Sequence, residues 1–148
     1  MGSQEVMISM GFGKKVYEEK GRFTSDFLES VEPEKTIMKA TFTSEIEGSG
    51  RWPSGMNMGS GTMMVYRYGY ASGEWRGTMG TKEGDRVLWW ATGRSKMVDG
   101  MRKGILLFGY YTEAEDLAWM NSVICIGEVE TDMKEMRVRV HEWEPGSP

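Results

Sequence analysis

The sequence predicts a single all-β domain over residues 1–148, a mainly antiparallel up-and-down barrel of about seven or eight strands with one or two short helices. Most of the chain alternates apolar and polar residues with a period of two, which is typical of a half-buried strand. The 20 glycines are spread along the chain at turn-like spacing. No crossover helices separate the strand-like runs. An open sandwich would show the same alternation and stays as the competing architecture.

Composition and charge restrict the possible functions. The net charge of −4 and the scattered Lys and Arg residues exclude a polyanion-binding surface, so no nucleic-acid partner is expected. The one cysteine, Cys125, excludes an intramolecular disulfide and favours a reducing compartment. The apolar runs are too short to cross a bilayer, and the first residues show no signal-peptide pattern. We therefore expect a cytoplasmic protein without a membrane partner.

The N-terminal segment 1–35 has a less regular pattern than the rest. Alternation over 6–12 predicts a first strand, and 24–31 predicts a short helix that Pro33 ends. The next strand is predicted over 38–46, where five alternate residues form one mostly apolar face. These residues are Met38, Ala40, Phe42, Ser44 and Ile46.

The remaining chain reads as a meander. The segment 48–61, rich in Gly, Ser, Pro and Met, predicts a long loop around Trp52. Six strand-like runs follow, at 62–70, 74–81, 85–92, 101–111, 123–130 and 136–143. Three tight turns that end in glycine are predicted at 71–73, 82–84 and 98–100. Thr112 and Glu115 fit a capping box, so a helix of about two turns is expected at one end of the barrel.

Three tyrosines with period-two spacing, Tyr66, Tyr68 and Tyr70, are predicted to share one strand face. If this face points inward, the phenol groups can hydrogen-bond a ligand while the rings form apolar wall. If it points outward, it forms a surface or oligomer patch, because Tyr is common at interfaces. Both orientations stay open.

The tryptophans on neighbouring strands indicate self-association. Trp89 and Trp90 are adjacent and must face opposite sides of their strand, so at least one indole lies outside the barrel. An outward indole suggests that another surface covers it. We therefore expect a homo-oligomer, most simply a homodimer.

Paired carboxylates are the next candidates for chemistry. Glu45 with Glu47, and Glu128 with Glu130, can share a proton if their faces are buried, or form a solvated outer face. The last strand carries Arg137 and Arg139, which suit cross-strand pairing with Glu128 and Glu130. The single histidine, His141, and the single cysteine, Cys125, are expected to be structural, so neither a metal nor a cofactor is expected.

Two segments resemble a family of uncharacterised lipocalin-like barrels. They are Gly73-Glu-Trp-Arg-Gly-Thr-Met-Gly-Thr-Lys-Glu-Gly-Asp and Thr112-Glu-Ala-Glu-Asp-Leu-Ala-Trp-Met-Asn, with the closing Glu142-Trp143-Glu144. In outline such barrels are similar to the calycins, to allene oxide cyclase and to dirigent proteins. The resemblance implies a ligand cavity, a homo-oligomer and, in some relatives, cofactor-free cyclisation or isomerisation. It carries over no catalytic residue.

Three functions follow from these patterns. The first is a barrel that binds a small, largely apolar or aromatic molecule, with candidate ligand-binding residues Tyr66, Tyr68, Trp75, Trp90, Arg94, Tyr110 and Glu45. The second is a cofactor-free isomerase or cyclase with candidate acid–base residues Glu45, Glu47, Arg94 and Glu128. The third is a structural or interaction barrel filled by its own Met and aromatic side chains. A cavity-lining carboxylate with a raised pKa would favour the enzyme, and a wholly apolar cavity would exclude it.

Overall fold

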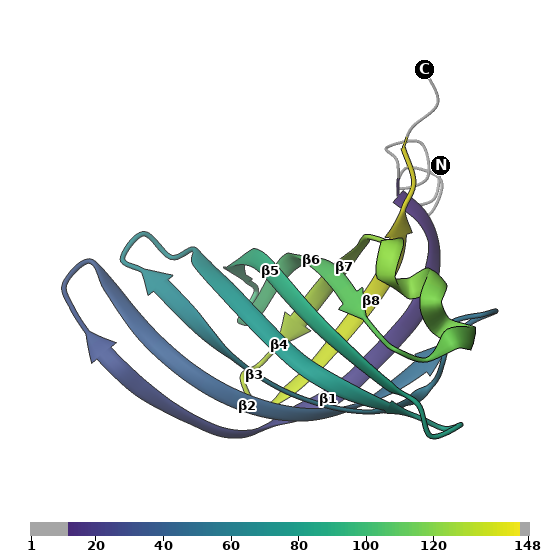
Figure 1. The fold of residues 1–148 in the computed structure, drawn as a ribbon. Helices are drawn as coiled ribbons and strands as arrows, with labels where there is room; N and C mark the ends of the chain where they lie inside the picture. Colours follow the sequence, from purple (N-terminus) through teal and green to yellow (C-terminus); the bar gives the residue numbers. More distant parts are fainter. Residues whose placement is uncertain (1–11, 146–148) are drawn as a thin grey trace.

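Eight antiparallel strands close into a barrel in the computed structural model, which describes residues 12–145 (Figure 1). The strands are β1 Phe12–Val31, β2 Lys35–Gly48, β3 Gly55–Tyr66, β4 Ala71–Thr81, β5 Arg86–Val98, β6 Met101–Tyr111, β7 Cys125–Thr131 and β8 Glu135–Trp143. Each strand pairs with its neighbours in sequence, and β8 pairs with β1 to close the sheet. The predicted all-β, up-and-down fold is therefore confirmed. No helix within the described residues is long and apolar enough to span a membrane.

The predicted helix over 24–31 is wrong, because these residues continue β1. They pair with β2, for example Asp26 with Ala40 and Leu28 with Met38, across two local register shifts. The long β1–β2 hairpin gives this segment backbone partners that outweigh the local helix signals. The predicted strand over 6–12 lies outside the described residues except for Phe12, where β1 begins.

The predicted loop over 48–61 is shorter than expected, since β3 already begins at Gly55. Glycines in β3 lie where aromatic rings pack inside the barrel. A Cβ on Gly61 would lie 2.3 Å from the Trp75 ring, and one on Gly59 would lie 2.6 Å from the Phe42 ring. The glycines let these rings pack against the strand backbone. A strand of this barrel therefore has the composition of a loop.

The hairpin turns agree with the sequence in two of three cases. Gly84 and Gly100 adopt φ values of +95° and +81°, as the turns predicted there require. The turn predicted at 71–73 is wrong, because β4 begins at Ala71 and the turn lies just before it, around Gly69.

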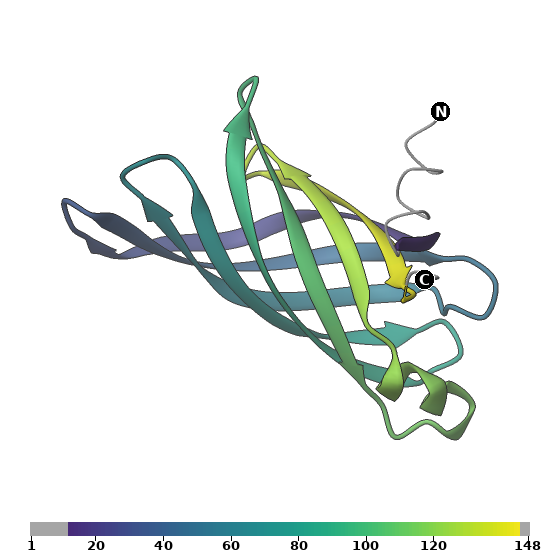
Figure 2. The same ribbon diagram turned by 90° about the horizontal axis from the view of Figure 1, so that it is seen from above.

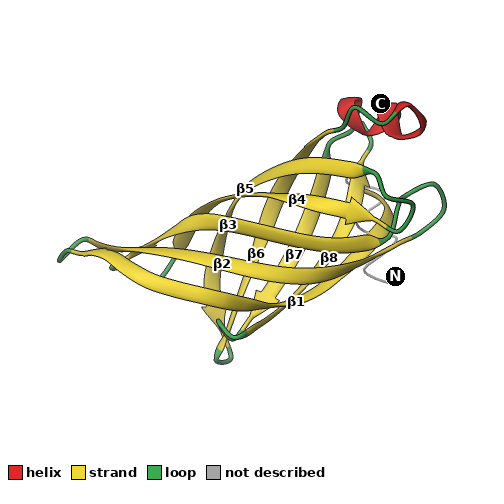
Figure 3. Cartoon of the chain, turned by 60° about the horizontal axis from the view of Figure 1, so that its bottom comes forward, coloured by secondary structure: helices red, strands yellow, loops and turns green. Residues whose placement is uncertain are grey.

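The barrel has two unlike ends. The four hairpin turns of β1–β2, β3–β4, β5–β6 and β7–β8 form one end, which we call the mouth (Figures 1 and 2). The short 3₁₀ helix η1, Glu115–Ser122, lies at the opposite end, which we call the closed end (Figure 3). The predicted helix is present, but its capping box is not formed. Instead, Thr112 Oγ1 donates to the Arg86 carbonyl at 2.7 Å, and Asn121 Oδ1 accepts from the Thr112 N–H at 2.7 Å.

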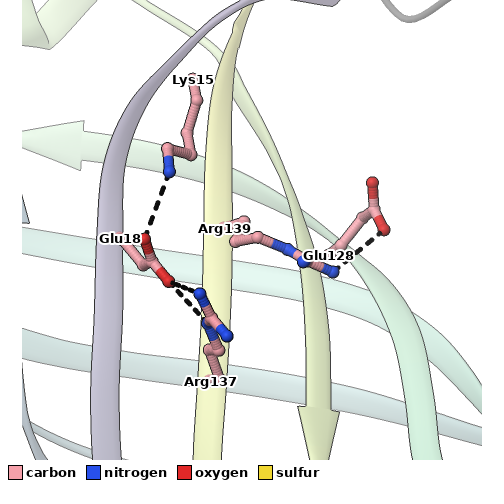
Figure 4. A network of polar contacts seen from close by, with 5 residues as sticks. All are labelled: Lys15, Glu18, Glu128, Arg137 and Arg139. Carbon is pink, nitrogen blue, oxygen red and sulfur yellow. Dashed lines mark hydrogen bonds and ion pairs between the residues drawn. The ribbon is translucent and has the colours of Figure 1, made fainter. Parts of the chain in front are cut away.

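Charged side chains cross the outer surface where β1, β7 and β8 meet (Figure 4). Arg137 Nε donates to Glu18 Oε1 at 2.5 Å, and Lys15 lies 3.2 Å from Glu18 Oε2. The hydrogen bond from Arg137, followed by that from Lys15, lowers the pKa of Glu18. Glu128 pairs in register with Arg139, as predicted, and their charged groups are 3.8 Å apart. Polar groups on this face therefore support closure of the sheet.

Candidate functional site

Aromatic rings fill the closed half of the barrel interior. Trp52, from the loop between β2 and β3, lies 5.5 Å from Tyr17, 5.5 Å from Tyr110 and 4.9 Å from Trp119, measured between ring centroids. The Tyr17 and Tyr110 hydroxyl oxygens are 2.6 Å apart. Burial raises the pKa of both phenols well above their ordinary value, so both stay neutral at physiological pH. About 20 Å³ of free space is left among these rings, so this half is packed by its own side chains.

A buried polar network crosses the barrel above these rings. Glu19 on β1 is 4 % exposed, and its Oε1 accepts hydrogen bonds from Ser44 Oγ at 2.5 Å and Asn57 Nδ2 at 3.0 Å. The Trp89 indole N–H donates to Asn57 Oδ1 at 2.6 Å. Burial raises the pKa of Glu19, and these hydrogen bonds lower it by less. Both protein hydrogen bonds reach Oε1, which leaves Oε2 for a proton or a ligand.

A cavity of about 80 Å³ lies between this network and the mouth. Alternate residues of the strands point into it, as the period-two pattern requires. Its apolar wall is formed by Phe23, Phe42, Met63, Trp75, Trp89, Ala91, Leu106, Phe108, Val129, Met133, Met136 and Val138. Glu19 borders both this cavity and the small void of the closed half. The ionisable groups of the cavity wall are Glu19, Arg94 and Arg102.

One guanidinium group, that of Arg102, lies where the cavity meets the mouth, and Arg94 lies nearby with its side chain on the outer face. Arg102, the second residue of β6, is only 9 % exposed, and its Nη1 donates to Ser95 Oγ at 3.1 Å. Arg94 on β5 is exposed and lies 5.7 Å from the centroid of the Tyr70 ring. Within the described residues, neither arginine forms an ion pair with a carboxylate. Burial lowers the pKa of Arg102, yet a guanidinium stays charged in proteins.

The structure brings two of the seven predicted site residues to this cavity, Trp75 and Arg94. Tyr110 lies in the packed closed half instead. Glu45 is exposed on the outer face, as are Glu47 and Glu128, two of the suspected acid–base residues. The Trp90 ring is also outside the barrel, 51 % exposed.

Tyr66, Tyr68 and Tyr70 do not share one strand face, contrary to the prediction. β3 ends at Tyr66, and Tyr68 and Tyr70 follow it in the turn to β4. The rings of Tyr66 and Tyr70 stack with centroids 4.7 Å apart, and Tyr68 is 80 % exposed. Gly69 between them has a φ of +99°, which breaks the alternation. None of the three lines the interior cavity.

Trp89, Glu19 and Arg102 were not among the predicted site residues, although the sequence carries a signal for each. Neighbouring residues of a strand face opposite sides. Trp89-Trp90, Glu18-Glu19 and Arg102-Lys103 are adjacent like residues, so one of each pair must point inward. In the structure Trp89, Glu19 and Arg102 are buried, whereas Trp90 and Lys103 are exposed.

The remaining candidates have structural roles in the described part of the chain. His141 is buried, and its Nδ1 lies 3.0 Å from the Gly13 carbonyl oxygen. Burial raises the pKa of the Cys125 thiol to about 12, so it is not an activated nucleophile. Among residues 12–145, no three His, Cys, Asp or Glu side chains are grouped to hold a metal ion.

Solved structures with low sequence identity share this fold. A β-barrel-like protein from Acinetobacter baumannii is similar with a TM-score of 0.77 and 12% identity, covering 90% of this chain and 95% of that one. A conserved protein of unknown function from Rhodopseudomonas palustris has a TM-score of 0.75 and 15% identity, with coverages of 87% and 95%. An enzyme from Penicillium herquei has a TM-score of 0.68 and 11% identity, with coverages of 86% and 92%. No protein-family model and no curated protein sequence matches the chain.

Proposed function

We propose that the barrel binds a small, largely apolar molecule in the cavity between the Glu19 network and the mouth. This proposal rests on the difference in packing between the two halves of the barrel interior. The closed half is filled by side chains, whereas the mouth half keeps about 80 Å³ free behind an apolar wall with few polar groups. Such a lining, with a small number of placed polar groups, is typical of ligand pockets. As part of the same proposal, we infer that this barrel is related to the lipocalin-like barrels.

The size of the cavity limits the ligand. A volume of 80 Å³ is below the roughly 300–1,000 Å³ of typical drug-sized pockets, so the ligand is compact. Met63, Met133 and Met136 contribute to the wall. Methionine side chains are flexible and adapt to irregular shapes, so these three allow some expansion around a larger ligand.

Adjacent residues of β6 provide a matched test. Leu106 lines the cavity, and Ile105 on the same strand is exposed on the outer face. We expect Leu106→Trp to fill the cavity and reduce binding of hexan-1-ol and 2-phenylethanol at least tenfold, while Ile105→Trp leaves binding unchanged. Two-dimensional NMR of the indole N–H signals would measure it, since Trp75 and Trp89 line the cavity. Native mass spectrometry of freshly purified protein would also detect a retained ligand. If neither these alcohols nor the carboxylates of the same carbon skeletons bind, and no ligand is retained, the proposal is wrong.

A second candidate function is cofactor-free acid–base catalysis by Glu19. Its carboxyl group is the cavity-lining acid with a raised pKa that this hypothesis requires. One similar solved structure is described as an enzyme, which makes catalysis on this barrel shape worth testing. Isomerisation of an unsaturated carbonyl compound would be lost in Glu19→Gln and kept in Glu45→Gln, whose carboxylate lies outside. Equal rates in the two variants would exclude Glu19 as the acid or base.

Self-association remains a proposal about the outer surface. Trp90 on β5 and Ile105 and Leu107 on β6 are each more than half exposed. Exposed apolar residues on neighbouring strands suit an interface between two copies. We expect a dimer by light scattering, and we expect Leu107→Lys to convert it to a monomer.

A further inference from the structure

Arg102 is a charged group whose surroundings do not balance its charge. Its side chain is more than nine-tenths buried and lines the cavity. A guanidinium has five N–H donors, and its one side-chain partner in the described residues is Ser95 Oγ. Burying a charge without a partner of opposite charge costs several kcal/mol in general. No Arg102 nitrogen is both fully buried and unpartnered, so the fold keeps a cation without a carboxylate partner at the inner side of the mouth, with its other N–H groups open to the cavity or solvent.

No carboxylate of the described residues neutralises Arg102. Glu19 is the one acid in the cavity wall, and its oxygens are beyond ion-pair distance from Arg102. Glu19 Oε1 is already held by Ser44 and Asn57. Arg94 borders the cavity from β5, but its side chain is exposed on the outer face beside Tyr70. Arg102 is therefore the positive charge that an anion in the cavity would meet.

We infer that the ligand of this cavity carries an anionic group, a carboxylate or a similarly planar oxyanion, that pairs with Arg102 while its apolar body extends toward Trp75 and Trp89. The inference rests on the proposed function and names the chemical class of its ligand. A guanidinium fork matches two carboxylate oxygens, which gives both attraction and orientation. The apolar wall beyond Arg102 then selects for a hydrocarbon or aromatic body.

Matched pairs of probes test this inference. Hexanoate is compared with hexan-1-ol, and phenylacetate with 2-phenylethanol, because each pair shares a carbon skeleton and differs in charge. Wild-type protein is expected to bind the carboxylate of at least one pair ten or more times more tightly than its alcohol. Arg102→Met should remove this preference, and Arg102→Lys should keep part of it. Lys103→Met is the control, since Lys103 is the next residue of β6 and is exposed.

The outcomes separate the two proposals. If the alcohols bind, Leu106→Trp abolishes their binding, and the carboxylates bind no better, the cavity is a binding site and the anion inference is wrong. A preference that survives in Arg102→Met, or that Lys103→Met removes as well, also overturns it. If no probe binds to wild-type protein and native mass spectrometry detects no retained ligand, both proposals fail. Near-UV circular dichroism establishes that each variant is folded, and the wild-type comparison decides alone if Arg102→Met does not fold.

Discussion

The two halves of the barrel interior are built from similar side chains, but they differ in how their buried polar groups are paired. In the closed half, the Tyr17 and Tyr110 hydroxyls pair with each other, and three aromatic rings have centroids 4.9–5.5 Å from that of Trp52. In the mouth half, free space remains and the Arg102 guanidinium lacks a carboxylate partner among residues 12–145. The closed half is closely packed, and the mouth half keeps free space beside a guanidinium without a carboxylate partner, an arrangement that suits a ligand.

The comparison predicts the largest stability loss for truncation in the closed half. Trp52 is 6 % exposed and contacts three aromatic rings, so Trp52→Ala should lower the free energy of unfolding by about 3–5 kcal/mol. Trp75 in the mouth half is only partly buried. Trp75→Ala should cost about 1–3 kcal/mol, because a less buried ring loses less burial energy. Urea unfolding monitored by circular dichroism measures both. Equal losses would mean that the halves do not differ in packing.

Most substitutions of buried residues lower the free energy of unfolding, but Arg102→Met is expected to raise it. Arg102→Met replaces a buried, unneutralised cation with an apolar side chain of similar length. The free energy of unfolding of the ligand-free protein should rise by about 1–2 kcal/mol, since the desolvation cost of the charge is removed. Arg94→Met, at an exposed position, should change it by less than about 0.5 kcal/mol. Thermal melts at pH 7 provide the measurement. A marked loss of stability in Arg102→Met would show that the guanidinium supports the fold.

The sequence predicts the closed barrel better than it predicts these two halves. A period of two reports which residues share a face, and that sufficed for β2 and for the partners Glu128 and Arg139. It does not report which strands are long or where free space remains. The second half of β1 and the start of β3 depend on hairpin partners and on rings that pack against Gly59 and Gly61. Charged residues that point inward, such as Glu19, look like outer residues to a pattern based on hydrophobicity.

Glu19 lies at the boundary of the two halves, and its titration should reveal its burial. Because burial raises its pKa in the folded state, the unfolded chain ionises first as pH rises. Stability from this group is therefore complete below the unfolded pKa, near 4.3, and is lost as pH rises toward the folded pKa. The stability of Glu19→Gln minus that of wild type should increase over this window by up to about 1.4 kcal/mol per pH unit, then level off. A difference that stays constant or falls between pH 4 and pH 8 contradicts the burial argument.

The smallest effect concerns the outer surface of the closed half, where Glu18 joins β1 to β8 (Figure 4). Arg137 and Lys15 lower the pKa of Glu18, so this group stabilises the fold above its unfolded pKa and stops doing so as pH falls through the folded value. Glu18→Gln should cost no more than about 1 kcal/mol at pH 7, because exposed ion pairs contribute little. The cost should shrink in 1 M NaCl and as pH falls through the folded pKa of Glu18. Glu128→Gln, whose ion pair with Arg139 spans 3.8 Å, should cost less. If Glu18→Gln instead matches the loss in Trp52→Ala, the closed half owes its stability to outer charges and not to its aromatic interior.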